Sequence, residues 1–346
     1  MINKENKKML GKFYTTNYDY ILQNFNIPNE ITNIIEPFAG KGDLLNFIKN
    51  KEAYNITCYD IDPQQDFITK QDTFIDTPDF TNKFVITNPP YLARNKSTEK
   101  KYFDKYNTND LYKCFIQILI DQPCLGGIII VPLNFICSIR KNDIHLREKF
   151  LQKYNIHTIN IFEEKVFKDT KYTVCSFQFS LSEKEENKDI LCNIYPLNKK
   201  FVYVFNKHNN FSIGGEIYNL PQKDTYKIDR ATHIHKEKKY FTNILIKCID
   251  DNINNQIEMS IVENIDTYID KTTKLSSRSY AILVIEPLLD NEKQQKLVDD
   301  FNTFLNAQRE TYHSLFLTNY RESNSIARKR ISFGLVYKIC NFLLNK

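Results

Sequence analysis

The sequence predicts an α/β protein that has a seven-stranded sheet and carries a second, α+β domain toward its C-terminus. Between residue 31 and about residue 160, short apolar runs alternate with amphipathic segments, which is typical of a parallel sheet with helices between its strands. The charged segment 182–188 contains no large apolar residue, so we place a domain boundary there, between 1–181 and 182–346. We expect strands at 31–36, 55–60, 67–71, 83–88, 127–133, 156–162 and 173–180, and helices at 17–25, 43–50, 110–121 and 143–153.

The composition is that of a globular intracellular protein. Eight cysteines are scattered without a Cys-x-x-Cys pair, which favours buried free thiols in a reducing compartment. Residues 1–10 lack the apolar core of a signal peptide, and the longest apolar run, 124–139, is shorter than a membrane span. His233 and His235 have no cysteine or carboxylate at ligand spacing, so we expect no metal site.

The first strand ends in a glycine-containing turn, the segment 36–43 with the sequence Glu-Pro-Phe-Ala-Gly-Lys-Gly-Asp. Gly40 and Gly42 allow a tight turn and the close approach of a ligand to the backbone. The segment has neither GxGxxG nor the ending of a phosphate loop, and an acid lies at each end, Glu36 and Asp43. This turn therefore favours a neutral or cationic nucleoside over a pyrophosphate.

Acidic residues also follow the second and third strands. Asp60 comes 20 residues after Gly40, the spacing at which a dinucleotide fold places the carboxylate that binds ribose hydroxyls. Asp62 precedes Pro63 and equally fits a turn residue. Asp72 is either an acceptor for an adenine amino group or an ordinary loop residue. Ligands of parallel sheets bind beyond the carboxyl ends of the strands, so we expect these acids near one site.

The fourth strand ends in Asn88-Pro89-Pro90-Tyr91. Proline fixes its own φ and biases the preceding residue toward extended backbone, so the Asn88 side chain and the Pro89 carbonyl form a rigid pair of acceptors beside an aromatic ring. By itself, the segment fits a strand that ends in a Pro-Pro turn as well as it fits a catalytic site.

The net charge of +5 is too small to establish a nucleic-acid partner, so local basic segments must supply the contacts. Two qualify: 96–105, which contains four lysines, and 321–330. Either also fits a solvated surface. The second domain, with strands expected at 201–205, 243–248 and 280–284 and helices at 291–306 and 333–343, shows no chemistry in its sequence.

The motifs of residues 10–181, taken as a series, resemble those of S-adenosylmethionine-dependent DNA adenine-N6 methyltransferases of the gamma order, the Taq-type enzymes of restriction-modification systems. Single members such as Asn-Pro-Pro-Tyr also occur in glutamine and ribosomal-RNA methyltransferases. The matching segments are Lys12–Thr16, the turn at 36–42, Tyr59–Asp62, Gln71-Asp72, Asn88–Tyr91, Asp110–Tyr112, Gly126-Gly127 and Val166-Phe167.

The resemblance implies a Rossmann-like methyltransferase sheet, S-adenosylmethionine as cofactor, double-stranded DNA as partner and, in the usual setting, a restriction endonuclease for the same DNA site. Lys168, where many relatives have proline, and Phe38, which replaces a smaller residue, depart from the pattern. The implied catalytic residues are Asn88, Pro89, Pro90, Tyr91, which would stack on the target base, and Phe167, which would close its opposite face. Implied cofactor contacts are Tyr14, Thr15, Glu36, Pro37, Ala39, Gly40, Gly42, Asp60, Ile61, Asp72 and Asn88.

By the same resemblance, the second half would be a DNA target-recognition domain. Candidate DNA contacts are Lys96, Lys100, Lys101, Arg278, Arg321, Arg328, Lys329 and Arg330. Two alternatives are a protein-glutamine or RNA methyltransferase and a catalytically idle DNA-binding subunit. Only about 30 residues precede the first strand, whereas glutamine-modifying relatives carry a sizeable helical domain there, which favours DNA. The intact Asn88, Tyr91, Asp60 and loop glycines favour an active enzyme.

Overall fold

The computed structural model describes residues 15–167, 172–182, 189–235, 239–250, 256–272, 279–319 and 329–346. The chain divides into two compact units, 1–205 and 206–346, and each is described here by itself. The division follows Phe205 and not the charged segment 182–188, because two strands after that segment, β8 (Ile190–Tyr195) and β9 (Lys199–Tyr203), join the sheet of the first unit.

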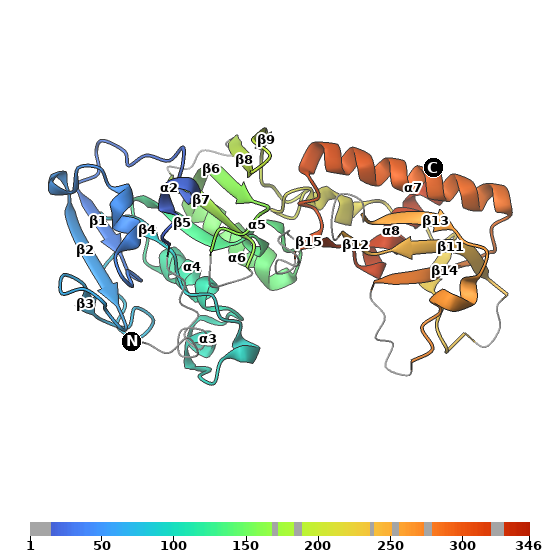
Figure 1. Ribbon diagram of the computed structural model, residues 1–346, viewed down its shortest axis with the longest axis horizontal. Coiled ribbons are helices and arrows are strands. Elements are labelled where there is room, and N and C mark those ends of the chain that lie inside the picture. Colours follow the sequence, from blue (N-terminus) through green and yellow to red (C-terminus); the bar gives the residue numbers. More distant parts are fainter. Residues whose placement is uncertain are drawn as a thin grey trace. The chain divides into compact units, whose positions relative to one another are not determined.

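The first unit is built on a mixed sheet of nine strands in the order β3-β2-β1-β4-β5-β7-β6-β8-β9 (Figure 1). All seven predicted strands are present, and β8 and β9 extend the sheet beyond them. Neighbouring strands from β3 to β5 are parallel, whereas β7 is antiparallel to both β5 and β6. The strands are β1 (Asn33–Glu36), β2 (Asn55–Asp60), β3 (Thr69–Lys70), β4 (Phe84–Thr87), β5 (Gly126–Pro132), β6 (Tyr154–Phe162) and β7 (Val174–Leu181).

The strand order reverses at β1, which has β2 on one side and β4 on the other. Such a switch point opens a crevice outside the carboxyl ends of the strands, where ligands of α/β sheets bind. Because these strands are parallel, their carboxyl ends meet at one edge of the sheet. Glu36 and Asp60 end β1 and β2, and Asn88 directly follows β4.

The helices of the first unit are short apart from α4 and α6. In α4, all residues except Gln117 and Asp121 are buried, as expected for a helix that is apolar on nearly every side. The helix predicted at 43–50 is wrong in type and length, because Asp43–Phe47 form one 3-10 turn, η1. Asn46 and Asn50 favour turns over helix, and β2 begins soon afterwards. The helices are α2 (Tyr18–Ile21), α3 (Lys101–Tyr106), α4 (Leu111–Asp121), α5 (Asn134–Cys137) and α6 (Lys141–Lys153), and η2 (Lys51–Ala53) and η3 (Arg94–Lys96) are 3-10 turns.

In the second unit, two helices pack with a four-stranded antiparallel sheet of order β10-β14-β11-β13. A small second sheet has the order β12-β16-β15. Strands were predicted near β11 and β14 and helices near α7 and α8, and all four are present. The elements are η4 (Gly215–Asn219), β10 (Lys227–Arg230), β11 (Phe241–Lys247), β12 (Ile249–Asp250), β13 (Glu258–Ile261), η5 (Ile265–Tyr268), β14 (Tyr280–Glu286), α7 (Asn291–Tyr312), β15 (Thr318–Asn319), β16 (Lys329–Arg330) and α8 (Phe333–Leu344).

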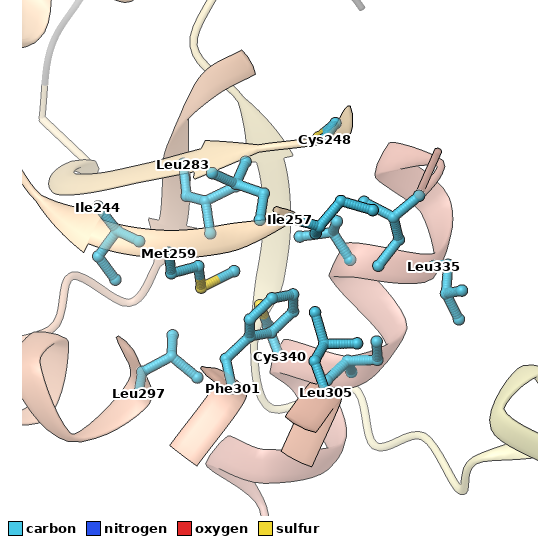
Figure 2. Close-up of a cluster of buried hydrophobic side chains, with 14 of the residues drawn as sticks. Ile244, Cys248, Ile257, Met259, Leu283, Leu297, Phe301, Leu305, Leu335 and Cys340 are labelled. Atoms are coloured by element: carbon cyan, nitrogen blue, oxygen red, sulfur yellow. The ribbon is translucent and has the colours of Figure 1, made fainter. Parts of the chain in front are cut away.

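The core of the second unit lies between these helices and the larger sheet (Figure 2). Leu297, Phe301 and Leu305 are four residues apart on α7, so they lie on one face of the helix. Phe301 points toward Met259 of the sheet in Figure 2 and is fully buried. Cys340 of α8 belongs to the same core.

Phe301→Ala should lower the free energy of unfolding of the second unit by about 3 to 5 kcal/mol, because it removes a buried ring and leaves a cavity. Urea unfolding followed by circular dichroism measures the change. Thr303→Ala, at an exposed position of the same helix, is the control and should change the value by less than about 0.5 kcal/mol. A loss below about 1 kcal/mol in Phe301→Ala would contradict this packing.

All eight cysteines are buried and free, which confirms the prediction made for them. Burial raises the pKa of the Cys58 thiol, with the Glu36 carboxylate adding to the effect. Across the described ranges, no helix has both the length and the apolar character that crossing a bilayer requires.

Candidate functional site

The turn after β1 forms the floor of a pocket at the switch point. Gly40 and Gly42 have φ values of 56° and 79°, in the left-handed region that favours glycine. The Gly40 N–H donates to Asp60 Oδ2 at 2.8 Å, which ties the turn to the end of β2. A Cβ atom on Gly42 would come within 3.0 Å of the Phe67 ring. The predicted tight turn is therefore present.

One pocket brings together most of the predicted cofactor residues. Two of the predicted residues, Pro37 and Gly42, are not among the residues that line the pocket. The Pro37 carbonyl accepts a hydrogen bond from the Thr73 hydroxyl at 2.7 Å. Tyr14 lies outside the described residues. The predicted site residues that line the pocket are Thr15, Glu36, Ala39, Gly40, Asp60, Ile61, Asp72, Asn88 and Pro90. The pocket is also lined by residues that were not predicted as contacts, which are Phe38, Asp43, Leu44, Gln71, Thr73, Phe74, Tyr102 and Leu111.

Carboxylates dominate the electrostatics of this pocket. Glu36 is only 1% exposed, and burial raises its pKa well above the ordinary value, with the charges of Asp60 and Asp43 adding to the effect. Within the described part of the chain, Glu36 Oε2 and Asp43 Oδ2 are buried without a hydrogen-bond partner. Buried oxygens of this kind are costly unless a partner reaches them, so the pocket is suited to a ligand that carries positive charge or N–H donors.

Asp60 and Asp72 are held by hydrogen bonds from the chain itself. Besides the bond from Gly40, Asp60 Oδ1 accepts from the Asp62 N–H at 2.8 Å, so Asp62 shapes the turn after β2. Asp72 Oδ1 accepts from the Phe74 N–H at 3.0 Å, and Asp72 Oδ2 accepts from the Tyr102 hydroxyl at 2.6 Å. A carboxylate has about four acceptor sites, so Asp72, which accepts these two bonds, keeps capacity for a ligand.

Asn88 lies between the pocket and the ring that follows it in sequence. Its Nδ2 donates to Thr15 Oγ1 at 3.0 Å, and its Oδ1 accepts a hydrogen bond from the Tyr91 hydroxyl. The Tyr91 hydroxyl also lies 2.9 Å from the Ile130 carbonyl oxygen on β5. The sequence did not indicate these contacts, because Thr15, Asn88 and Ile130 are far apart along the chain.

Tyr91 is buried, and its ring packs edge-on against two other rings. The ring centroids of Tyr112 and Tyr172 lie 6.2 and 5.8 Å from that of Tyr91. Phe167 is also buried. The roles predicted for Tyr91 and Phe167 at a target base stay predictions.

Asp110 anchors the chain directly after the Asn-Pro-Pro-Tyr segment. Its Oδ1 accepts from the Leu92 N–H at 3.1 Å, and the Leu111 N–H donates to the Leu92 carbonyl at 3.2 Å. Burial raises the pKa of Asp110 from 3.8 to about 6, although nearby Lys113 and the backbone N–H groups partly oppose the shift. Lys113 itself is buried and ion-paired with Asp143.

Replacing Asp110 with asparagine should change stability in a pH-dependent way. Because the pKa of Asp110 is raised in the folded state, the unfolded chain ionises first, and stability present below pH 3.8 is lost as the pH rises through about 6. The free energy of unfolding of the wild type relative to Asp110→Asn should therefore fall by up to about 3 kcal/mol over this range. Urea titrations at several pH values measure the difference. Asp121→Asn, at an exposed position, is the control, and a pH-independent difference for Asp110→Asn would contradict the assignment.

The predicted basic contacts have different surroundings. Lys96 and Lys101 are exposed, and the Lys100 ammonium donates to the Arg94 and Ser97 carbonyls. Lys329 is only 6% exposed, and its ammonium donates to the His313 carbonyl at 3.1 Å. Arg330 is half-buried in β16. The other predicted DNA contacts, Arg278, Arg321 and Arg328, lie outside the described residues.

Similar solved structures include the modification subunit of a putative type I restriction enzyme from Vibrio vulnificus YJ016. It is 15% identical, with a TM-score of 0.43 over 55% of this chain and 48% of that chain. The type IIG restriction endonuclease BpuSI is 16% identical, with a TM-score of 0.41 over 70% of this chain and 38% of that chain. This chain thus spans less than half the length of either protein.

A curated relative is the flagellar hook-length control protein of Buchnera aphidicola subsp. Schizaphis graminum, which is 25% identical over 198 residues. The match covers 52% of this chain and 52% of that protein, so the chain spans about half the length of the relative. Residues 9–167, which contain the whole pocket and the Asn-Pro-Pro-Tyr segment, match the family described as Eco57I restriction-modification methylase.

Proposed function

We propose that the protein is a site-specific DNA adenine-N6 methyltransferase. It transfers the methyl group of S-adenosylmethionine to the N6 amino group of an adenine flipped out of double-stranded DNA. One observation carries the proposal: the acid-lined pocket at the switch point shares Asn88 with the Asn-Pro-Pro-Tyr segment. A nucleoside site and a rigid acceptor for an amino group therefore adjoin. The match of residues 9–167 to a restriction-modification methylase family supports the same activity.

The residues of the pocket fit S-adenosylmethionine as cofactor. Glu36 Oε2 and Asp43 Oδ2 are buried oxygens that lack a partner among the described residues, and this cofactor carries positive charge. Asp60 is suited to accept from ribose hydroxyls and Asp72 from the adenine amino group. When bound, S-adenosylmethionine supplies a methyl group on a positively charged sulfur.

The chain's own contribution to catalysis is to bind and orient the amino group that receives the methyl. The lone pair of an adenine amino nitrogen is delocalised into the ring, which makes it a poor nucleophile. Asn88 Oδ1 and the Pro89 carbonyl accept from the two N–H groups, which favours a pyramidal nitrogen and stabilises the positive charge that develops on it. This is preorganised electrostatic stabilisation, and the geometry of binding adds the benefit of proximity.

The target adenine must leave the duplex to reach Asn88, at a cost of a few kcal/mol. Stacking of the extruded base on an aromatic ring offsets about 1 to 3 kcal/mol, and Tyr91 and Phe167 are the proposed rings. Asn88 Oδ1 accepts from the Tyr91 hydroxyl in this structure. The incoming amino group therefore replaces the hydroxyl as the hydrogen-bond donor to Asn88.

We further propose that the second unit, residues 206–346, recognises the DNA target, while Lys96, Lys100 and Lys101 contact phosphates. Phosphate contacts position a protein on DNA, and base-edge contacts supply sequence specificity. Among the predicted contacts, exposed Lys96 and Lys101 fit a phosphate role directly. Buried Lys329 fits one only if its ammonium leaves the His313 carbonyl. A restriction endonuclease that cuts the same DNA site is the proposed functional partner.

Incubation with methyl-labelled S-adenosylmethionine and DNA, RNA or protein substrates tests the activity. We expect label in double-stranded DNA, recovered as N6-methyladenine after digestion to nucleosides. Label in RNA or on protein glutamine alone would contradict the proposal and favour the corresponding alternative. DNA binding without label in any substrate would favour an idle DNA-binding subunit. Methylation-sensitive sequencing of DNA from expressing cells then identifies the target site.

A further inference from the structure

Tyr102 lines the pocket although it lies in a segment predicted to contact DNA. It belongs to α3, within the lysine-containing segment 96–105. Its hydroxyl donates to Asp72 Oδ2 at 2.6 Å, and Tyr102 and Asp72 line the same pocket. A segment that directly follows the Asn-Pro-Pro-Tyr motif thus supplies part of the wall around the predicted adenine acceptor.

Helix α3 is attached to the loop after β3 through several contacts at Phe74. The Lys105 ammonium and the Tyr106 hydroxyl donate to the Phe74 carbonyl at 2.8 and 3.1 Å. The ring centroids of Tyr102 and Phe74 are 5.3 Å apart, and the Lys101 ammonium lies 5.1 Å from the centroid of the Tyr102 ring. The ring contact with Phe74 places Tyr102 at the pocket wall.

The Tyr102 hydroxyl also holds the carboxylate of Asp72. Burial raises the pKa of Tyr102, and the bond to Asp72 raises it further, so the hydroxyl keeps its proton and donates at neutral pH. One oxygen of Asp72 accepts from Tyr102 and the other from the Phe74 N–H. The carboxylate plane is thereby fixed, while free lone pairs on its oxygens remain for a ligand.

We propose that Tyr102 is a nucleoside-binding and positioning residue. Its ring forms one wall of the pocket, and its hydroxyl orients Asp72 to accept from the exocyclic amino group of an adenine nucleoside. The inference rests on the proposed function, which takes S-adenosylmethionine as the ligand. Because Tyr102 belongs to α3, nucleoside binding and the folding of α3 are coupled, and each favours the other. A bound nucleoside therefore also stabilises α3 and the lysines that it carries.

The test compares two ligands that differ at the 6-position edge of the base, S-adenosylhomocysteine, which has an amino group there, and S-inosylhomocysteine, which has a carbonyl oxygen that cannot donate to Asp72 and a hydrogen on N1. Calorimetric titration of the full chain gives both dissociation constants for the wild type, Tyr102→Phe, Tyr102→Ala and Tyr106→Phe. Tyr106 is the matched control, since it is on the same helix and bonds Phe74 but lies outside the pocket lining.

The wild type should prefer the adenine ligand by about tenfold, as expected for a hydrogen bond to a carboxylate. Tyr102→Phe keeps the ring and should lower this preference about threefold to fivefold, since Asp72 loses its orientation. Tyr102→Ala should weaken the binding of both ligands by about tenfold or more through loss of the aromatic wall. Tyr106→Phe should keep the wild-type preference.

Trypsin provides a second measurement, because Lys100, Lys101 and Lys105 are cleavage sites in or next to α3. S-adenosylhomocysteine should slow cleavage at these lysines in the wild type and in Tyr106→Phe, and should not slow it in Tyr102→Ala. Thermal unfolding identifies a Tyr102→Ala protein that does not fold, and Tyr102→Phe then carries the test by itself.

The outcomes separate this inference from the proposed function. A wild type that binds S-adenosylhomocysteine, together with an unchanged ligand preference in Tyr102→Phe, would overturn the role of Tyr102 and leave the proposed function standing. A wild type that binds neither S-adenosylhomocysteine nor S-adenosylmethionine would overturn the proposed function before any substitution is made, and the inference with it.

Discussion

Asn88→Ala should slow methyl transfer to DNA by about a hundredfold to a thousandfold, the loss typical of removing one preorganised group that stabilises developing charge. The acceptor Asn88 Oδ1 disappears, whereas the carboxylates of the pocket remain. Single-turnover kinetics with labelled S-adenosylmethionine measure the rate, and calorimetry measures the affinity for S-adenosylhomocysteine, which should stay within about threefold.

Asn95→Ala is the matched control for this substitution. Asn95 is exposed in the 3-10 turn η3 shortly after the motif, and its replacement should leave the rate unchanged. If Asn88→Ala also lost its affinity for S-adenosylhomocysteine, the slower transfer would follow from weaker cofactor binding and the acceptor role would be wrong. An unchanged rate would contradict the proposed mechanism.

Glu36→Gln should weaken the binding of S-adenosylmethionine by about tenfold to a hundredfold and, in the absence of ligand, make the protein more stable. Affinity is lost because the substitution removes a buried carboxylate charge that would interact with the ligand. A hydrogen bond to a charged group contributes about 1.5 to 3 kcal/mol. The gain in stability has a separate cause. Burial and the neighbouring Asp60 and Asp43 raise the pKa of Glu36, so its ionised form is unfavourable in the folded protein. Glutamine has nearly the same shape and no charge.

The sign of the pH dependence follows from the same shift. Stability that Glu36 contributes in its protonated form is lost as the pH rises through its raised pKa, so the advantage of Glu36→Gln should grow with pH. Scanning calorimetry over a pH series and ligand titration measure the two effects. Glu52→Gln, at an exposed position, is the control. Wild-type affinity in Glu36→Gln would show that the ligand does not meet this carboxylate.

The opposite directions of these two effects are typical of a functional site. A folded chain keeps an unfavourable buried carboxylate only where a ligand compensates for it, and substitutions that relieve such strain commonly stabilise the protein at the expense of activity. Glu36→Gln therefore distinguishes a binding site from a structural acid. A structural acid with satisfied hydrogen bonds would lose stability on the same substitution.

The pattern of apolar residues was sufficient to predict the seven strands β1 to β7. Strand periodicity is local, and parallel strands must end at the same edge, so acids after β1, β2 and β3 and the amide after β4 were expected near one another. The structure confirms that Glu36, Asp60, Asp72 and Asn88 line one pocket. The prediction of a helix at 43–50 was wrong because short-range turn preferences outweighed helix periodicity there.

The sequence by itself determined the positions of strands β1 to β7, the glycine turn and the set of polar residues at the strand ends, because each depends on neighbours within a few positions. Only the tertiary structure decided the contact of Tyr91 with Ile130 and the placement of Tyr102 against Asp72. Those contacts join residues that are distant in sequence and meet only when β4 pairs with β5 and α3 packs against the loop after β3. The addition of β8 and β9 to the first sheet has the same cause, because strand pairing depends on which edge of the sheet is free after folding. It does not depend on the charged segment 182–188, which lies between β7 and β8 in the sequence.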